Sequence, residues 1–335
     1  MERKTVFYFF QHGLSRINRI FAPHVPKTIG KMKWKGHLAI LLANVIFGLG
    51  VPVTKALLSG WVTPMGYMAS RCVFAALIFW VVAAFMPKEK VERRDLIVLL
   101  AGGLIGFVIS QTLTAESLKL TTPVYFSFVA ALTPIATMLL AVVFLKESIT
   151  GVKLLGVVLG IAGALLMVYK SWSNKAGSDD LIGILLAVLS VLTWAVYLII
   201  TRKVSAKYTA VTQMKYFFLI SAVIILPIAL TEPQQNTLYS ADWGWSGVAE
   251  MAFIVLFATG LGYFLIPYAM KTLSATTVSI YTNIQPVVAS FVAIAVAQDV
   301  FTWDKPLAGL LVLGGAYLVT ISPEKQDSEE AGKKA

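Results

Sequence analysis

The sequence predicts an all-α polytopic membrane protein whose ten transmembrane helices form two inverted five-helix repeats. The first observation is composition. Of the 335 residues, 58% are hydrophobic and only 13% are charged, and the mean hydropathy is +0.78. Soluble domains carry about 25% charged residues, so this chain lacks the polar surface of a soluble enzyme or a nucleic-acid-binding protein. The other two observations are the length of the apolar runs and an internal repeat.

Ten apolar runs are long enough to cross a bilayer. A helix needs about 20 apolar residues to span a hydrocarbon core of about 30 Å, and open sheets cannot span lipid. The runs are separated by short connections at turn-forming residues such as Pro87 and Thr150-Gly151. The predicted spans are 38–58, 64–86, 96–118, 122–145, 152–170, 181–201, 210–230, 248–270, 274–298 and 304–322.

The distribution of basic residues predicts the orientation. With the N-terminus inside, the inside segments hold 21 Lys and Arg and the outside segments hold four. Positive charge is retained on the cytoplasmic side of membrane proteins. We therefore expect both termini in the cytoplasm and a location in the inner (cytoplasmic) membrane. This asymmetry explains most of the net charge of +11 without a nucleic-acid partner.

The predicted organisation places the repeats between two polar tails. The boundaries are 1–36 for a basic N-terminal tail, 37–170 for the first repeat, 171–180 for a linker, 181–322 for the second repeat and 323–335 for a charged C-terminal tail. The run Val6–Phe10 is too short for a signal peptide. The first tail is expected to be either an interfacial amphipathic helix or an unstructured basic segment, and Met32 is an alternative start.

The internal repeat appears when the sequence is shifted by 152 residues. Residues 119–168 then align with 271–320 without a gap, which places Pro134 on Pro286 and Glu147 on Asp299. A shift of 147 residues aligns the first predicted span with the sixth. Each repeat has an odd number of spans, so the second has the opposite orientation. Inverted repeats are typical of secondary transporters, whose site lies near the midplane between the halves.

Several motifs resemble those of one transporter family. They are Ser117–Thr121 continuing to Leu132–Pro134, Phe144–Glu147 followed by Gly156 and Gly163-Ala164, Trp194–Tyr197 with Arg202-Lys203, and Gln285-Pro286. Across 38–322 the chain resembles the ten-helix, EamA-type branch of the drug/metabolite transporter superfamily. The resemblance implies translocation through a central cavity between the repeats, often as export of small metabolites. The chain departs from the family pattern at Gln298-Asp299, where Gly-Glu is usual.

Four ionisable residues within or at the ends of spans are candidates for gating or coupling, because such residues are costly in a membrane. Arg71 and Lys215 are rough repeat equivalents, which either draw or gate an anionic or zwitterionic substrate or have a structural role. Lys55, Arg71 and Glu116 are predicted at similar depth and could form an ion pair that acts as an outer gate. Alternatively, Glu116 couples transport to protons. Glu147 and Asp299 each precede a lysine by six residues and are expected to tether the following helix.

A wider polar and aromatic set lies near the predicted midplane, where rings with polar tips suit a cavity for a small amphipathic solute. It comprises Asn44, Gln111, Thr133, Trp194, Tyr197, Tyr263, Tyr281, Asn283 and Gln285. The predicted substrate-binding residues are Asn44, Trp194, Tyr197, Tyr263, Tyr281 and Gln285. Pro134 and Pro286 match between the repeats and are predicted hinges, because proline frees backbone carbonyls within a helix.

These features together predict a secondary transporter that moves small metabolites, amino-acid-like or amphipathic, outward by alternating access. Coupling to protons and coupling by exchange both remain open, as does the oligomeric state. The alternative is a membrane-embedded sensor or a lipid- or solute-handling protein that binds without net transport. We expect no enzyme, cofactor or metal site: no catalytic constellation lies in the spans, and His12, His24 and His37 precede or open the first span.

Overall fold

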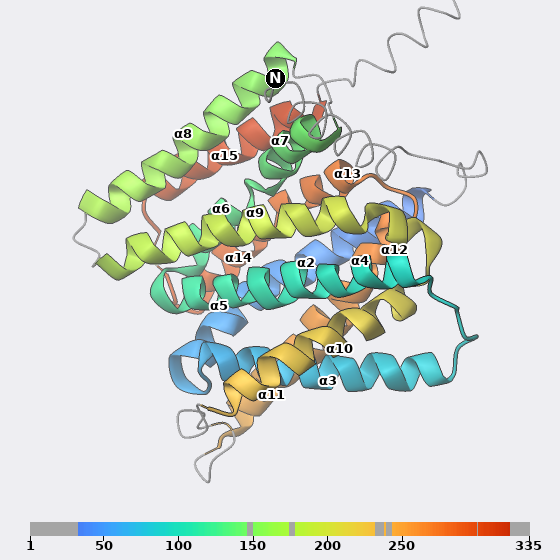
Figure 1. Cartoon of the computed structure of the whole chain (residues 1–335). Helices are drawn as coiled ribbons and strands as arrows, with labels where there is room; N and C mark the ends of the chain where they lie inside the picture. Colours follow the sequence, from blue (N-terminus) through green and yellow to red (C-terminus); the bar gives the residue numbers. More distant parts are fainter. Residues whose placement is uncertain are drawn as a thin grey trace, which may run out of the picture.

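The computed structural model describes residues 33–145, 150–173, 178–231, 238, 243–299 and 301–321. Throughout these ranges the secondary structure is helical, without a strand (Figure 1). The first half contains α2 (Lys33–Gly60), α3 (Pro64–Ala84), α4 (Arg93–Gly103), the π-helix η1 (Leu104–Ile109), α5 (Ser110–Leu120), α6 (Pro123–Ala130), α7 (Thr133–Leu145) and α8 (Gly151–Ser173).

The second half repeats this order of elements. It contains α9 (Ser178–Lys207), α10 (Ala210–Ala229), α11 (Trp245–Phe253), the π-helix η4 (Ile254–Gly262), α12 (Tyr263–Met270), α13 (Ala275–Ile280), the 3₁₀ turn η5 (Tyr281–Asn283), α14 (Ile284–Ala295) and α15 (Asp304–Ile321). The predicted N-terminal amphipathic helix, Glu147 and the C-terminal tail lie outside the described residues.

The apolar helices identify a multi-pass membrane protein. In the part of the chain that the structure describes, eight helical segments are long and apolar enough to cross a bilayer: α2, α3, α4 to α5, α6 to α7, α9, α10, α11 to α12 and α13 to α14. The apolar parts of α8 and α15 are shorter, at Gly151–Gly163 and Lys305–Leu318. The all-helical membrane fold predicted from composition is therefore confirmed, while the count of ten spans stays a prediction.

Short polar residues cap the starts of several helices. Two of these N-cap residues occupy equivalent positions in the two repeats. The Thr122 side chain accepts a hydrogen bond from the backbone N–H of Tyr125 (3.3 Å) at the start of α6. Ser274, 152 positions later, accepts from Thr277 (3.0 Å) at the start of α13. Such caps satisfy N–H groups that the first helical turn leaves unpaired. Because the caps are equivalent, corresponding helices of the two halves begin at equivalent positions.

The two halves pack with twofold-like symmetry. Second helices pair with each other, α3 with α10, and so do the last helices, α8 with α15. Figure 1 shows these two pairs at opposite sides of the bundle. Between them, α2 packs on α14 while its repeat equivalent α9 packs on α7. The central helices of both halves therefore surround a common axis.

Glycines allow the closest helix crossings. A Cβ atom at Gly315 of α15 would collide with the backbone of Gly156 and Gly160 in α8, and one at Gly163 would collide with α15. Similarly, a Cβ atom at Gly106 would meet the ring of Tyr197 on α9. Small residues let backbones approach in lipid, where association depends on van der Waals packing. These glycines thus serve contacts within the chain.

Equivalent spans of the two halves are interrupted at equivalent places. The π-helices η1 and η4 interrupt the third span of each half, and π segments are frequent at functional sites. In the fourth span the α-helix breaks between α6 and α7, and its counterpart breaks at η5. Pro134 and Pro286 lie in the first turn after these two breaks. Their role as hinges stays a prediction.

Candidate functional site

A cavity lies between the two halves. Its empty volume is about 720 Å³, including the space at its mouth, and its walls come from α2, α3, α5, α6, α7, α9, η4, α12, η5 and α14. We call the end of the bundle at which α2 and α3 meet the distal end, and the end at which α9 finishes the proximal end. Thr54, Tyr67 and Leu118 of the lining lie near the distal helix ends. The cavity therefore occupies the distal half of the bundle.

Arg71 is the cation of this cavity. The residue is only 3% exposed and lines the cavity from α3. Its Nε donates to Oγ1 of Thr259 (2.9 Å) and its Nη1 donates to Oε1 of Gln111 (3.1 Å). Both acceptors are uncharged. Within the described ranges no carboxylate forms an ion pair with Arg71, and no Asp or Glu lines the cavity.

Aromatic rings enclose the guanidinium. Its Cζ lies 4.8 Å from the ring centre of Phe107, 5.1 Å from that of Tyr67 and 5.9 Å from that of Tyr263. The hydroxyl of Tyr67 is held by Thr54 Oγ1 at 2.8 Å. The buried hydroxyl of Tyr263 makes at most a long contact with Arg71 and has no normal hydrogen-bond partner. Cation–π attraction of this kind fixes a guanidinium without neutralising it.

Five of the six predicted binding residues fall into two groups. Trp194, Tyr263 and Gln285 line the cavity. Asn44 and Tyr197 are buried beside the lining residues: Asn44 Oδ1 accepts from Gln285 Nε2 at 2.7 Å, and the Tyr197 ring centre lies 4.8 Å from that of Trp194. These two residues therefore support the wall.

The sixth predicted binding residue, Tyr281, is placed away from the cavity lining. Its hydroxyl lies 2.8 Å from Nδ1 of His37 on α2, and it is half-buried. This contact joins η5 to the proximal part of α2. His37 was expected only to open the first span, whereas α2 begins four residues earlier, at Lys33.

A cluster of aromatic rings, which we call the aromatic plug, lies on the proximal side of the cavity and includes Tyr263 of its lining. It comprises Phe107, Tyr197, Phe217, Phe218 and Tyr263, all of them buried. Phe107 is central, with ring centres of Phe218 at 4.9 Å, Tyr263 at 5.3 Å and Phe217 at 6.0 Å in edge-to-face arrangements. Such pairs pack favourably and leave little free space.

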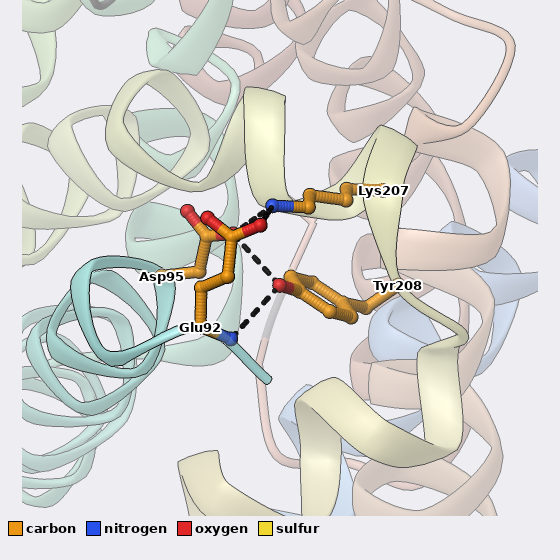
Figure 2. Close-up of polar contacts among 4 residues, drawn as sticks. All are labelled: Glu92, Asp95, Lys207 and Tyr208. Atoms are coloured by element: carbon orange, nitrogen blue, oxygen red, sulfur yellow. Dashed lines mark hydrogen bonds and ion pairs between the residues drawn. The ribbon is translucent and has the colours of Figure 1, made fainter. Parts of the chain in front are cut away.

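A polar cluster joins the two halves beyond the plug (Figure 2). Lys207 Nζ lies 2.7 Å from Glu92 Oε1 and 2.7 Å from Asp95 Oδ2. Tyr208 donates to Asp95 Oδ2 (2.8 Å) and accepts from the backbone N–H of Glu92 (3.2 Å). We call these four residues the proximal cluster. Because Glu92 and Asp95 belong to the first half and Lys207 and Tyr208 to the second, the cluster holds the halves together at this end.

A carboxylate in the loop between α3 and α4 adds a further contact between the halves. Glu89 accepts from the backbone N–H of Thr209 (3.0 Å) and from its hydroxyl (2.9 Å), at the start of α10. Partial burial opposes ionisation, but hydrogen bonds from Thr212 and Thr209 and the charge of Lys271 hold the pKa of Glu89 below its ordinary value. The ionised form therefore suits this position.

The remaining candidates for gating and coupling lie outside the cavity lining. Lys55 Nζ donates to the carbonyls of Leu118 (2.8 Å) and Thr121 (3.0 Å), where α5 ends. Cations favour this end of a helix. Glu116 is half-buried on α5. Lys215 lies over the rings of Trp80 (5.5 Å) and Tyr216 (4.8 Å), so it is not at the cavity with Arg71.

The predicted tether at the last helix is present. Lys305 Nζ lies 2.5 Å from Asp299 Oδ1, and both side chains are buried. The lysine also lies 5.8 Å from the ring centre of Tyr125 on α6. Asp299 thus connects the end of the α14 segment to α15 and to the first half, away from the cavity.

Several residues that surround Arg71 were not predicted from the sequence as binding residues. Gln111 belonged to the wider midplane set, and its amide oxygen accepts from Arg71. Tyr67, Phe107 and Thr259 carried no such signal, because aromatic and hydroxyl residues are common in spans. Their positions opposite Arg71 come from three different segments of the chain. Among the described residues, no group of His, Cys, Asp and Glu is arranged to hold a metal ion.

Comparisons with a family profile and with known proteins both indicate transporters. The sequence profile of the EamA-like transporter family matches residues 34–169 and again 181–321. The uncharacterized transporter YyaM of Bacillus subtilis is 26% identical over 76% of this chain and 84% of its own length. YetK, another uncharacterized transporter of that organism, is 21% identical over 95% of this chain and 97% of its own length.

A solved crystal structure shows the same fold. Its TM-score to this chain is 0.63 at 19% sequence identity, and the match covers 88% of this chain and 99% of that protein. The two profile matches coincide with the two halves defined by helix packing.

Proposed function

Because the chain belongs to the EamA-like transporter family, and is thus a membrane transporter, we propose that it exports small organic solutes by alternating access between its two halves. The solutes are amphipathic or amino-acid-like and bind in the cavity around Arg71. The membrane is the cytoplasmic membrane, with both chain termini inside. A solute gradient, exchange or a proton gradient supplies the driving force.

The observation that carries this proposal is a cavity with one closed end. Both halves contribute its walls, and it occupies the distal half of the bundle. The aromatic plug and the proximal cluster close the other end. In the orientation favoured by the basic residues, the distal end faces outward. The structure is then an outward-facing state.

The repeated breaks support a route to the opposite state. The breaks before Pro134 and Pro286 lie in helices that touch the central cavity on opposite sides of the pseudo-twofold axis. Inverted repeats can exchange their conformations, which closes one end and opens the other. In the inward-facing state, the contacts between Glu92, Asp95 and Lys207 separate.

Transport can be tested by plugging the cavity. Ala258 lines it from η4, whereas Ala252, in the same span, is exposed on the outside of the bundle. We would reconstitute the full chain in liposomes and measure counterflow of labelled solutes, with amino acids first. We expect saturable flux in the wild type and in Ala252→Phe, and loss of flux in Ala258→Phe. Saturable binding without flux in the wild type would favour the sensor instead.

Coupling is tested in the same liposomes with and without an imposed proton gradient. Glu116 is the candidate coupling residue. Flux that responds to the gradient and loses that response in Glu116→Gln would support proton coupling. Exchange that is independent of the gradient and survives this substitution would assign Glu116 a structural role.

A further inference from the structure

We propose that the cavity selects solutes with a carboxylate group, which Arg71 binds directly, and that it disfavours solutes with an ammonium group. The proposal deepens the proposed function: it rests on the cavity being the solute site and, of the two solute classes proposed above, favours amphipathic carboxylates over amino-acid-like zwitterions. The preferred solute is a small organic monocarboxylate with an apolar body.

Within the described residues, Arg71 is buried without a counter-charge. A buried cation is costly unless an anion accompanies it. Arg71 is 3% exposed, yet the side chains that accept its hydrogen bonds, Thr259 and Gln111, are both neutral. In the described part of the chain, no acidic side chain forms an ion pair with it or lines the cavity. An anionic solute would provide the charge that the protein omits.

The geometry of the guanidinium suits a carboxylate. Arginine has five N–H donors in a planar fork that matches a carboxylate. Thr259 accepts the N–H of Nε, and Gln111 accepts one of the two N–H groups of Nη1. Among the described residues, the guanidinium donates no further hydrogen bond of normal length to a side chain. Three rings hold the plane of the group in place, so donors remain for a solute without much loss of side-chain freedom.

The rest of the cavity lining suits a solute with an apolar body and no positive charge. Phe47, Phe126 and Trp194 line the cavity and give an apolar surface for a hydrocarbon or aromatic body. The polar lining is made of hydroxyl and amide groups, such as those of Ser190 and Gln285. An ammonium group would face Arg71 in the same small volume without an anionic partner. The cavity is therefore suited to a monoanion better than to a zwitterion or a cation.

A matched ligand series tests the charge class directly. We would measure equilibrium binding to the purified full chain for 3-phenylpropanoate, 3-phenylpropanamide, phenylalanine and phenethylamine, by calorimetry and by thermal stabilisation. These compounds share a ring and a short chain and differ in their charged groups. We expect the carboxylate to bind about tenfold or more tightly than the amide, with phenylalanine weaker and phenethylamine weakest.

Two substitutions test whether Arg71 is the group responsible. Arg71→Gln should abolish the preference for the carboxylate over the amide. Arg71→Lys should keep part of it, because the charge remains and the fork is lost. Lys215→Gln is the matched control, since Lys215 is a cation in a membrane helix outside the cavity lining. Lys215→Gln should keep the preference for the carboxylate over the amide within about twofold of the wild-type value.

The proposal would be overturned by equal binding of carboxylate and amide to the wild type. It would also be overturned by a preference that survives Arg71→Gln, or by no carboxylate binding up to about 10 mM. The wild-type comparison does not require the variant to fold. Because binding and not flux is measured, a sensor would still pass this test. A transporter of cations would fail it while showing flux.

Discussion

Gln285 donates from Nε2 to Oδ1 of Asn44 over 2.7 Å, and this bond joins α14 of the second half to α2 of the first. Asn44 also donates to the carbonyl of Ile40 at 2.8 Å, which fixes its amide orientation. Gln285 lines the cavity, so Asn44 positions a wall residue without lining the cavity itself. The bond is partly buried and lies where helices of both halves meet.

A double-mutant cycle should detect this bond. Asn44→Ala and Gln285→Ala are expected to be non-additive by about 0.5–1.5 kcal/mol in the free energy of unfolding, as for other hydrogen bonds between membrane helices. Val287 is on α14 but exposed, so Val287→Ala should add independently to Asn44→Ala. Strict additivity for the Asn44 and Gln285 pair would contradict this assignment.

The proximal cluster should favour the outward-facing state in the alternating-access cycle proposed above. Leu99 is buried at this end beside Val204 and Tyr208. In a Cys72→Ser background, a Leu99→Cys reporter should react slowly with a water-soluble maleimide. Adding Lys207→Met should raise the rate about two- to fivefold, because partly exposed ion pairs contribute up to about 1 kcal/mol.

The control for the proximal cluster is the exposed Arg94, which precedes Asp95 and forms no ion pair within the described residues. Arg94→Met should leave the maleimide rate of Leu99→Cys unchanged. An equal increase for both variants would mean that a general loss of positive charge, and not separation of the cluster, exposes the reporter.

The membrane fold could be predicted from sequence because composition and span length determine it. Lipid requires every backbone polar group to be paired within a helix, so an apolar run of about 20 residues has one solution. The boundaries were less certain: α2 begins at Lys33 although the predicted span begins at residue 38. Polar and aromatic residues near an interface are compatible with helix, so hydropathy alone underestimates its length.

The site was harder to predict, because every face of a buried membrane helix can be apolar. Hydropathy then predicts how deep a residue lies in the membrane, but it does not predict which side of the helix faces the cavity. Arg71 and Lys215 occupy related positions, yet Arg71 lines the cavity and Lys215 contacts Trp80 and Tyr216. The π-helices η1 and η4 also change the direction in which the following side chains face, relative to a regular α-helix. Helical periodicity in the sequence does not predict this change. Only packing against the other half fixes these directions.

The crossing of α8 and α15 should tolerate no added methyl group at Gly315. A Cβ atom there would overlap backbone atoms of Gly156 and Gly160, which cannot move independently. Gly315→Ala is expected to lower the free energy of unfolding by about 1–3 kcal/mol. Thermal unfolding in a mild detergent would measure the change.

Gly314 provides an adjacent control on the same helix. A Cβ atom at Gly314 would have no neighbour within 4 Å. Gly314→Ala should therefore be neutral or slightly stabilising, because alanine favours a helix by about 1 kcal/mol over glycine. Similar effects at both positions would show that helix propensity, and not the contact with α8, dominates.

The contact between Glu89 and Thr209 should make stability depend on pH. The pKa of Glu89 in the folded chain is below the ordinary value of 4.5. A lowered folded-state pKa means that the ionised group contributes stability, fully present above the unfolded-state pKa and lost as pH falls through the folded-state pKa. Glu89→Gln should therefore be less stable than the wild type at neutral pH.

The difference between wild type and Glu89→Gln should shrink as the pH is lowered below about 4.5. Thermal unfolding between about pH 7 and pH 3.5 would measure it, with Lys88→Gln as the control for a charge change in the same loop. A difference that stays constant down to the lowest pH would contradict ionised Glu89 as its source. Because this carboxylate holds the α3–α4 loop against the start of α10, Glu89→Gln should also loosen the proximal end and speed labelling of the Leu99→Cys reporter at neutral pH.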